Sequence, residues 1–404
     1  MHIKINIERA YKYFDKATLF FLCALIFFIP ISNAAIQICV SLTILSFIGA
    51  TITKKLKNIP KTALDIPLLA FFIFLCFSVI FSINPHKSLI SLILKNFEWF
   101  LLFFIVVATL NTKKRINVFL KVLFFSALCV AIDGLTQQIF GHDLFRGQAF
   151  QERISASFRH YNDFAAYLGV MFPITISLYV CNENKLRPYF IFLSVLLGYC
   201  LVMTLSRGGY FTTFIGINFI VFFSLIKLKS LNYKKLAINL LIFINLLVLT
   251  MVIGIYNLRL DLIIERLRIS GGAGRNGIWE YATLLIKARP FFGYGMGSFM
   301  GLFSQLNKSI SPTYAHNCYL QMLVESGLFG LLSFLAIVFV FFKTTLKTVI
   351  KNNDFLLLGV SSGILVFLIH AGFDTHFYSM QLSDFFWIIL GLAIAMVKNG
   401  PVEI

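Results

Sequence analysis

Charged residues are scarce in this chain of 404 residues: they make up 13% of it, whereas hydrophobic residues make up 59%. Apolar runs of about 20 residues, long enough to cross the hydrocarbon core of a bilayer, recur along the sequence. The longest interval without a convincing apolar run is 257–313, so no soluble domain of ordinary size is left over. The sequence therefore predicts a single all-α polytopic membrane domain over residues 1–404, with 257–313 as its one large loop.

Cysteines at metal-binding or disulfide spacing are also lacking. The seven cysteines are scattered, odd in number and mostly inside apolar runs, and none belongs to a CxxC pair. They indicate neither a disulfide framework nor a structural zinc site. A small-residue cleavage site is lacking as well, because the first apolar run, which begins near Ala17, is followed directly by another. We therefore expect no removable signal peptide.

The apolar runs predict about 12 transmembrane helices. Pro30–Asn33 separates the first two runs, which would otherwise form one long broken helix. The predicted segments are 17–30, 34–52, 64–83, 89–110, 117–138, 161–181, 188–205, 208–226, 236–256, 326–342, 354–371 and 384–397.

The distribution of positive charge predicts the orientation of these helices. With a cytoplasmic N-terminus, 22 of the 35 lysines and arginines fall in or beside the inside segments. The net charge of +18 is therefore mainly the positive-inside signature of a membrane protein, and it gives no reason to expect nucleic-acid binding. Both termini are expected in the cytoplasm, and the loop 257–313 is expected on the outer side.

Arginine is concentrated on the predicted outer side, where lysine is rare. Because a guanidinium group binds phosphate or carboxylate through two parallel hydrogen bonds, this bias indicates an anionic ligand. The alternative is a set of ordinary ion pairs with acidic residues of the same loops. The outer arginines are Arg146, Arg153, Arg159, Arg207, Arg259, Arg266, Arg268, Arg275 and Arg289.

Two glycine-rich stretches carry arginines of this group. LSRGGY places Arg207 in a sharp turn between two apolar segments, where it either snorkels to the interface or binds an anion. Residues 270–299 contain neither a GK[ST] sequence nor a glycine fingerprint after a strand, which excludes the common nucleotide-binding motifs. An apolar stripe predicts instead a helix over 276–288 that lies on the membrane surface and stops before Pro290, with Arg275 at its N-terminal entrance.

A third polar stretch, TYAHNCYLQMLVESG, leads into an apolar segment. If residues 314–326 are helical, Asn317, Gln321 and Glu325 recur at every fourth position and form one polar stripe, with His316 at its outer end. Polar groups at this depth need a partner or a cavity. The stripe is either a site or a hydrogen-bonded contact between helices. A histidine there is mainly neutral at pH 7 and is able to accept a proton from a hydroxyl group.

The remaining polar residues allow several interpretations. His370, Asp374 and His376 occur together, but their spacing does not establish a metal site, and Asp374 is better interpreted as an orienting or ion-pairing carboxylate. Within the apolar segments, we expect Lys95 and Glu98 to form an ion pair on one helix.

We also expect Asp133, another acidic residue within an apolar segment, to pair with an arginine of the 146–159 loop.

The ordered set of motifs resembles the O-antigen ligase and polymerase superfamily of bacterial inner-membrane glycosyltransferases. The motifs are SRGGY at 206–210, GRNGIW at 274–279, PFFGYGMGSF at 290–299 and AHNCYLQMLVESGLFG at 315–330. ASFRHYNDFAAYLGVMFP at 156–173 is also similar. It differs from the family where Ala156–Phe158 and His160–Asn162 replace a glycine-threonine-phenylalanine and an asparagine-proline-asparagine stretch.

This resemblance implies a metal-independent and cofactor-free enzyme of the inner membrane with a periplasmic active site. Its donor would be a glycan on undecaprenyl diphosphate, and its acceptor a hydroxyl of lipid A-core. By resemblance, Arg207 and Arg275 would bind the diphosphate and His316 would be the general base, with support from Asn317, Gln321, Glu325 and Asp374.

Three other functions remain open at this stage. An O-antigen polymerase and a protein O-oligosaccharyltransferase belong to the same superfamily and would use the same active centre. The competing class is a transporter for an anionic solute, which would account for charged residues within the apolar segments. We see no clear repeat of the first half of the chain in the second, which is a feature of many transporters.

Overall fold

The computed structural model describes residues 2–53, 60–181, 186–227, 273–306 and 314–402. All regular elements in these ranges are helices, and a single isolated bridge joins His142 to Ala149. The all-α prediction is confirmed for the described chain. The elements are α1 (His2–Phe28), α2 (Asn33–Thr53), α3 (Asp65–Ile80), α4 (Pro85–Ser91), η1 (Leu92–Asn96), α5 (Phe97–Thr109), α6 (Lys113–Phe140), α7 (Tyr161–Cys181), α8 (Arg187–Met203), α9 (Arg207–Lys227), α11 (Ala273–Ala288), α12 (Phe299–Leu306), α13 (Cys318–Asn352), α14 (Phe355–His370), η2 (His376–Tyr378) and α15 (Met380–Asn399).

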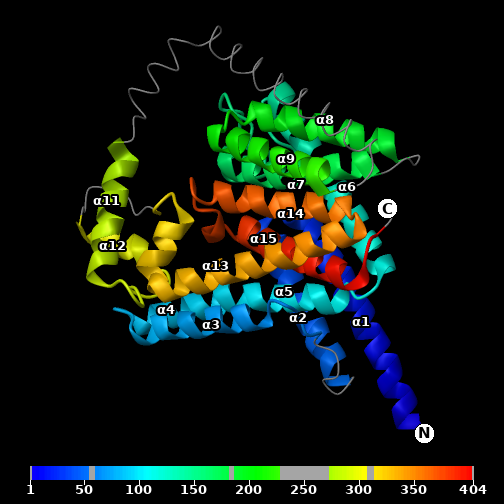
Figure 1. Ribbon diagram of the computed structural model, residues 1–404, viewed down its shortest axis with the longest axis horizontal. Coiled ribbons are helices and arrows are strands. Elements are labelled where there is room, and N and C mark those ends of the chain that lie inside the picture. The colour runs from blue at the N-terminus through cyan, green and yellow to red at the C-terminus, as the bar shows by residue number, and fades with distance from the viewer. Residues whose placement is uncertain (1, 54–59, 182–185, 228–272, 307–313, 403–404) are drawn as a thin grey trace.

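The helices form a bundle with α15 at its centre. Figure 1 shows α3, α13, α14, α7 and α9 running side by side, with α11 and α12 at one end of the bundle. In α15, 89% of the most apolar stretch is buried, compared with 33% to 56% in the other long apolar helices of the described chain. Helix α15 packs against α5 and α14, and α14 packs in turn against α7 and α9.

Six described helices are long and apolar enough to cross a membrane, and α3, α8 and α14 are shorter apolar helices. Eleven of the twelve predicted segments coincide with helices, and α7 has the predicted bounds of 161–181. The helical conformation is interrupted between α1 and α2, at the predicted Pro30–Asn33, and the two helices pack together. The segment 236–256 lies outside the described residues. These helices support a helical membrane protein, while the number of about 12 spans and their sidedness stay predictions.

Helix α11 confirms the helix predicted over 276–288, while its position on a membrane surface stays a prediction. Its apolar stripe packs against Phe299, Ala315 and Val324 of the same chain. Helix α12 and the start of α13 supply this apolar partner for the stripe, which no periodicity within α11 itself reveals. The other parts of the predicted loop, 257–272 and 307–313, lie outside the described residues.

Helix α13 is interrupted at Gly327, where φ is 68° and ψ is −171°. A Cβ at this position would lie 2.2 Å from the carbonyl oxygen of Phe291, so only glycine fits. The Leu328 N–H donates to the Pro290 carbonyl at 2.7 Å, and the Tyr294 N–H donates to the Val324 carbonyl at 2.8 Å. The backbone of the motif PFFGYGMGSF is therefore hydrogen-bonded to the backbone of the motif VESGLFG.

Two predicted ion pairs inside the apolar helices are wrong. Lys95 and Glu98 are separated by the end of the π-turn η1, and the Glu98 carboxyl faces Asp384 of α15 instead. Asp133 accepts the Leu144 N–H at 2.7 Å and pairs with no arginine of its loop.

The Arg146 guanidinium, from the loop that was expected to supply the partner of Asp133, donates to the Ser157 carbonyl at 2.8 Å. For Lys95 with Glu98, and for Asp133 with a loop arginine, the backbone between the two charged residues holds their side chains apart.

Candidate functional site

His316 lies in the turn before α13. Its φ of 49° is uncommon for a residue other than glycine. The next residue, Asn317, caps α13 by accepting the N–H groups of Tyr319 and Leu320 at 3.0 and 3.1 Å. The helix begins at Cys318, so the condition that residues 314–326 are helical is met only from Cys318 onward, and Asn317 is its cap. The His316 side chain is 35% exposed, which leaves it accessible to a substrate.

Asp374 is the partner of His316. Its Oδ1 lies 3.3 Å from the His316 Nδ1 and accepts the Thr375 N–H at 2.8 Å, and its Oδ2 accepts from the Asn162 amide at 2.8 Å. Burial opposes ionisation of Asp374, but these donors and the nearby His376 outweigh it and hold its pKa below the ordinary value. An ionised Asp374 favours the tautomer with the proton on the His316 Nδ1, which leaves Nε2 as a base.

The loop that carries Asp374 is fastened to the start of α13. The Cys318 N–H donates to the Ala371 carbonyl at 2.8 Å, and the Cys318 thiol donates to the Asp374 carbonyl at 3.2 Å. Cys318 is therefore a buried connecting residue between the two segments that hold His316 and Asp374.

Asn162 and Ser206 extend this network to two more helices. The Ser206 hydroxyl donates to the Asn162 side-chain oxygen at 2.9 Å and accepts the Gly209 N–H at 3.3 Å. Asn162 is at the start of α7, and Ser206 directly precedes α9. Four segments distant in sequence thus belong to one hydrogen-bonded network that includes Asp374. Sequence reasoning assigned Asn162 no role, although it lies in the HYND stretch already noted for its family likeness.

His376 and His370 form a second, fully buried group beside the first. The His376 Nδ1 lies 3.6 Å from an oxygen of Asp163, and the two histidine rings are 4.5 Å apart. Within the described residues, no group of three histidine, cysteine or acidic side chains is arranged to hold a metal ion. A Cβ at Gly208 would lie 2.9 Å from the His370 Nε2, so this glycine of the SRGGY motif allows α9 to pack closely on α14.

The two predicted anion-binding arginines are both exposed. Arg207 is the first residue of α9 and follows the Ser206 of the network. Arg275 lies in the first turns of α11, one turn before Trp279, whose indole N–H donates to the Ala315 carbonyl at 2.9 Å. Residues four apart share a helix face, so Arg275 is on the face of α11 that reaches the residue before His316. Contact between either guanidinium and His316 is not formed in the described structure, so a shared pocket stays a prediction.

The other two residues of the predicted stripe are buried and hydrogen-bonded. The Gln321 oxygen accepts the Ala315 N–H at 3.1 Å, and its nitrogen donates to Glu325 at 3.2 Å. Glu325 also accepts from the Tyr378 hydroxyl at 3.1 Å. Gln321 thus supports the backbone next to His316, while Glu325 joins α13 to η2.

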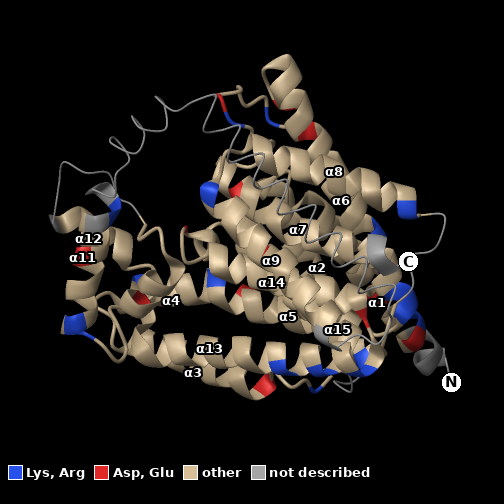
Figure 2. Ribbon diagram, turned by 45° about the horizontal axis from the view of Figure 1, so that its top comes forward, with Lys and Arg blue, Asp and Glu red and all other residues tan. Residues whose placement is uncertain are grey.

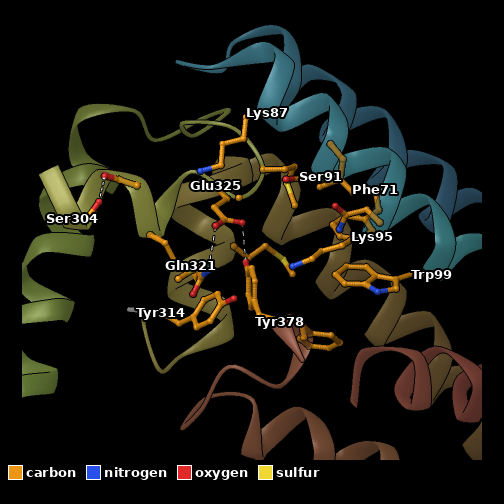
Figure 3. Close-up of a pocket in the computed structure, with 18 residues that line it drawn as sticks. Phe71, Lys87, Ser91, Lys95, Trp99, Ser304, Tyr314, Gln321, Glu325 and Tyr378 are labelled. Atoms are coloured by element: carbon orange, nitrogen blue, oxygen red, sulfur yellow. Dashed lines mark hydrogen bonds between the residues drawn. The ribbon is translucent and has the colours of Figure 1, made fainter. Parts of the chain in front are cut away.

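A cavity of about 420 Å³ is lined in part by Gln321 and Glu325. Figure 3 shows Gln321, Glu325 and Tyr378 at its wall, with Lys87 and Lys95 extending into it from the opposite helix. Sequence reasoning missed this cavity, because its lining comes from many separate elements, α3, α4, η1, α5, α12, α13 and η2.

Comparisons with known proteins relate the chain to the O-antigen ligases. A family model described as O-Antigen ligase matches residues 192–335, the region that contains Arg207, Arg275 and His316. The chain is 25% identical over 317 residues to the ComP-specific O-oligosaccharyltransferase of Acinetobacter baylyi, and 24% identical over 317 residues to the O-antigen ligase of Salmonella typhimurium. These matches support the O-antigen ligase superfamily.

The matched region covers a different share of the length of each relative. The matched region is 75% of this chain and 52% of the Acinetobacter protein, so the chain spans about half the length of that relative. It is 74% of this chain and 74% of the Salmonella protein. Asp374 lies beyond the part that the family model matches, so its place beside His316 rests on the geometry alone.

Proposed function

We propose that this protein is an O-antigen ligase of the bacterial inner membrane. It transfers a glycan from undecaprenyl diphosphate to a hydroxyl of lipid A-core, with the site facing the periplasm. The observation that carries this proposal is the pairing of His316 with Asp374, at 3.3 Å, in a part-exposed turn within the superfamily's motif region. The similarity to an O-antigen ligase over about three quarters of both chains supports the ligase within the superfamily.

In the proposed reaction, the His316 Nε2 takes the proton of the acceptor hydroxyl. The hydroxyl oxygen then forms a bond to the anomeric carbon of the donor sugar, and the bond from that carbon to the diphosphate breaks with both electrons going to the phosphate oxygen. Asp374 stabilises the imidazolium that forms and keeps its orientation. Attack from the face opposite the leaving group gives inversion at the anomeric carbon.

Arg207 and Arg275 would bind the departing diphosphate. Their guanidinium groups offer paired hydrogen bonds and positive charge to the leaving group, the role that a metal ion has in other transferases. Arg207 also occupies the N-terminus of α9, where backbone N–H groups and the helix dipole favour an anion.

A deletion strain complemented at matched protein levels tests the proposal. We expect wild type to restore polymer on lipid A-core, whereas His316→Ala, Arg207→Lys and Arg275→Lys leave polymer on the carrier lipid. His142→Ala, which removes an exposed histidine outside the network, is the matched control and should behave as wild type. Transfer by His316→Ala at the wild-type rate would contradict the assignment of the base.

The same experiment separates the alternatives. The similarity to an O-oligosaccharyltransferase favours protein glycosylation as the second candidate, and it predicts loss of glycan from a protein while lipopolysaccharide is unchanged. A polymerase predicts lipid A-core that carries a single repeat. Unchanged glycans in every variant would favour an anionic solute transporter.

A further inference from the structure

The cavity beside Gln321 combines an apolar wall with two ammonium groups. Phe71 and Leu75 of α3, Trp99 of α5 and Phe377 of η2 line its apolar side. Its volume of about 420 Å³ falls in the range of small-molecule sites. Figure 3 shows Lys87, Ser91 and Lys95 along one side and Glu325 and Tyr378 across from them.

The π-turn explains why both lysines line the same cavity. Lys87, Ser91 and Lys95 follow one another at intervals of four residues, and on a continuous α-helix such a series drifts around the axis. Leu92–Asn96 form a π-turn, which holds more residues than an α-turn and offsets this drift. The helix therefore presents two ammonium groups and one hydroxyl along a single strip.

Neither lysine has a carboxylate partner in the described chain. The ion pairs whose two members both belong to the described residues are Arg115–Asp15, His316–Asp374 and His376–Asp163. Glu325, the carboxylate at the cavity wall, already accepts hydrogen bonds from Gln321 and Tyr378 and from the Phe299 N–H at 3.4 Å. Two ammonium groups thus line the cavity without an ion pair to any carboxylate of the described chain.

Glycines keep the opposite edge of the cavity open. Gly297 has a φ of 70°, and a Cβ there would lie 2.7 Å from the Ser91 hydroxyl oxygen. A Cβ at Gly301 would lie 3.7 Å from the Lys87 ammonium nitrogen. Side chains larger than glycine at these positions would occupy the space beside the lysines.

The lysines also lie on a helix with exposed apolar side chains. Leu89, Ile90, Ile93 and Leu94 alternate with the cavity-lining residues and are 44% to 67% exposed. This helix belongs to the candidate membrane span Pro85–Thr109. A ligand that reaches the cavity past these side chains is therefore amphiphilic, with an anionic head and a hydrocarbon chain.

We propose that this cavity binds the phosphate head and the first part of the chain of a phosphorylated lipid, with Lys87, Lys95 and Ser91 as ligands of the phosphate. The chemistry is shared by isoprenoid phosphates and phosphorylated acyl lipids. This site is distinct from the arginines of α9 and α11, and it does not depend on the proposed transfer reaction. It adjoins the candidate base, because Gln321 lines the cavity and holds the Ala315 N–H next to His316.

Equilibrium binding to the full-length protein in detergent tests the site. The radiolabelled probes are farnesyl phosphate and dodecyl phosphate, with farnesol and inorganic phosphate as competitors. We expect the Lys87→Met/Lys95→Met variant to bind the preferred lipid phosphate at least tenfold more weakly than wild type. The Lys87→Arg/Lys95→Arg variant should retain binding, and Lys351→Met, an exposed lysine at the far end of α13, should bind as wild type.

The competitors and a second variant decide between the outcomes. Preference for farnesyl phosphate identifies an isoprenoid carrier as the source of the phosphate, and preference for dodecyl phosphate identifies an acyl lipid. Competition by farnesol or inorganic phosphate as strong as that by the lipid phosphate overturns the proposal, as does unchanged binding to the double methionine variant. His316→Ala should bind as wild type, so loss of transfer in that variant and loss of binding in the lysine variant are separate results.

Discussion

His316 and Asp374 lie 58 positions apart in the sequence, yet the His316 Nδ1 and the Asp374 Oδ1 are 3.3 Å apart. The first residue precedes α13 and the second follows α14, and Cys318 joins their segments. An ionised Asp374 favours the His316 tautomer with the proton on Nδ1, and the first three predictions concern Asp374 and its partner Asn162.

Asp374→Asn should reduce glycan transfer by roughly 10²-fold or more. The asparagine nitrogen would donate to the His316 Nδ1, which moves the ring proton to Nε2 and removes the base. Transfer is measured in membranes with a labelled carrier-linked glycan. Asp374→Glu, which restores the carboxylate with a longer arm, should recover part of the activity; equal rates for Asn and Glu would show that the charge has no role.

Asp374 also predicts a pH dependence of stability. Because its pKa is lower in the folded protein than the ordinary value of about 4, its stabilising contribution is present above that value and is lost as the pH falls below it. Wild type should therefore melt at a higher temperature than Asp374→Asn above about pH 5, and the two melting temperatures should begin to converge as the pH falls below about 4. A difference that does not shrink between about pH 4 and pH 2 would contradict the lowered pKa.

Asn162→Asp should destabilise the site, because it places a second carboxylate 2.8 Å from Asp374 where an amide now donates. The double variant Asn162→Asp/Asp374→Asn restores one amide and one carboxylate and should recover the melting temperature. It should not recover transfer, since the carboxylate would no longer face His316. Recovery of both would mean that Asp374 has only a structural role.

Gly327→Ala should lower the free energy of unfolding by about 3 kcal/mol or more, because its positive φ is strained for alanine and the Cβ would clash with the Phe291 carbonyl. Gly277→Ala is the matched control. Gly277 lies in α11, and a Cβ added there would meet no atom within 4 Å, so alanine should stabilise the helix by about 0.5–1 kcal/mol. Thermal unfolding of both purified variants checks this opposite response.

Tyr378→Phe should cost about 1–3 kcal/mol, because a buried oxygen of Glu325 loses its donor. Burial and the neighbouring Glu325 raise the pKa of Tyr378 well above its ordinary value, so the hydroxyl keeps its proton and donates throughout the physiological pH range. Glu325→Gln in the Tyr378→Phe background should recover part of the loss, since a neutral amide replaces the buried carboxyl group that has lost its donor. Chemical denaturation of wild type and of the two variants measures these differences in the free energy of unfolding.

Hydropathy and turn residues were sufficient to place most of the helices. Apolar runs of the right length can satisfy their backbone groups only as helices, so α7 has the bounds that the sequence predicts. The turn at Ser206 and the polar start of α13 were also identified, because both interrupt apolar runs. These features depend on residues close together in the chain.

The partners of the site residues could not be predicted in the same way. Asp374 meets Asn162 only because α14 packs on α7, and the expected Lys95–Glu98 pair is absent because a π-turn changes the helix phase between them. The PFFGYGMGSF motif was noted for its glycines, but its backbone contact with Gly327 depends on a kink that no local pattern specifies. Long-range packing and irregular backbone determine these contacts.

The hydrogen bond from Trp279 to Ala315 couples the arginine-bearing helix to the candidate base. The indole of α11 holds the carbonyl of the residue next to His316 at 2.9 Å. If the proposed ligand at Arg275 displaced α11, this rigid side chain would transmit the displacement to the backbone beside His316. Figure 2 shows α11 and α12 at the edge of the bundle. The indole would then link the proposed donor binding mechanically to the alignment of the proposed base.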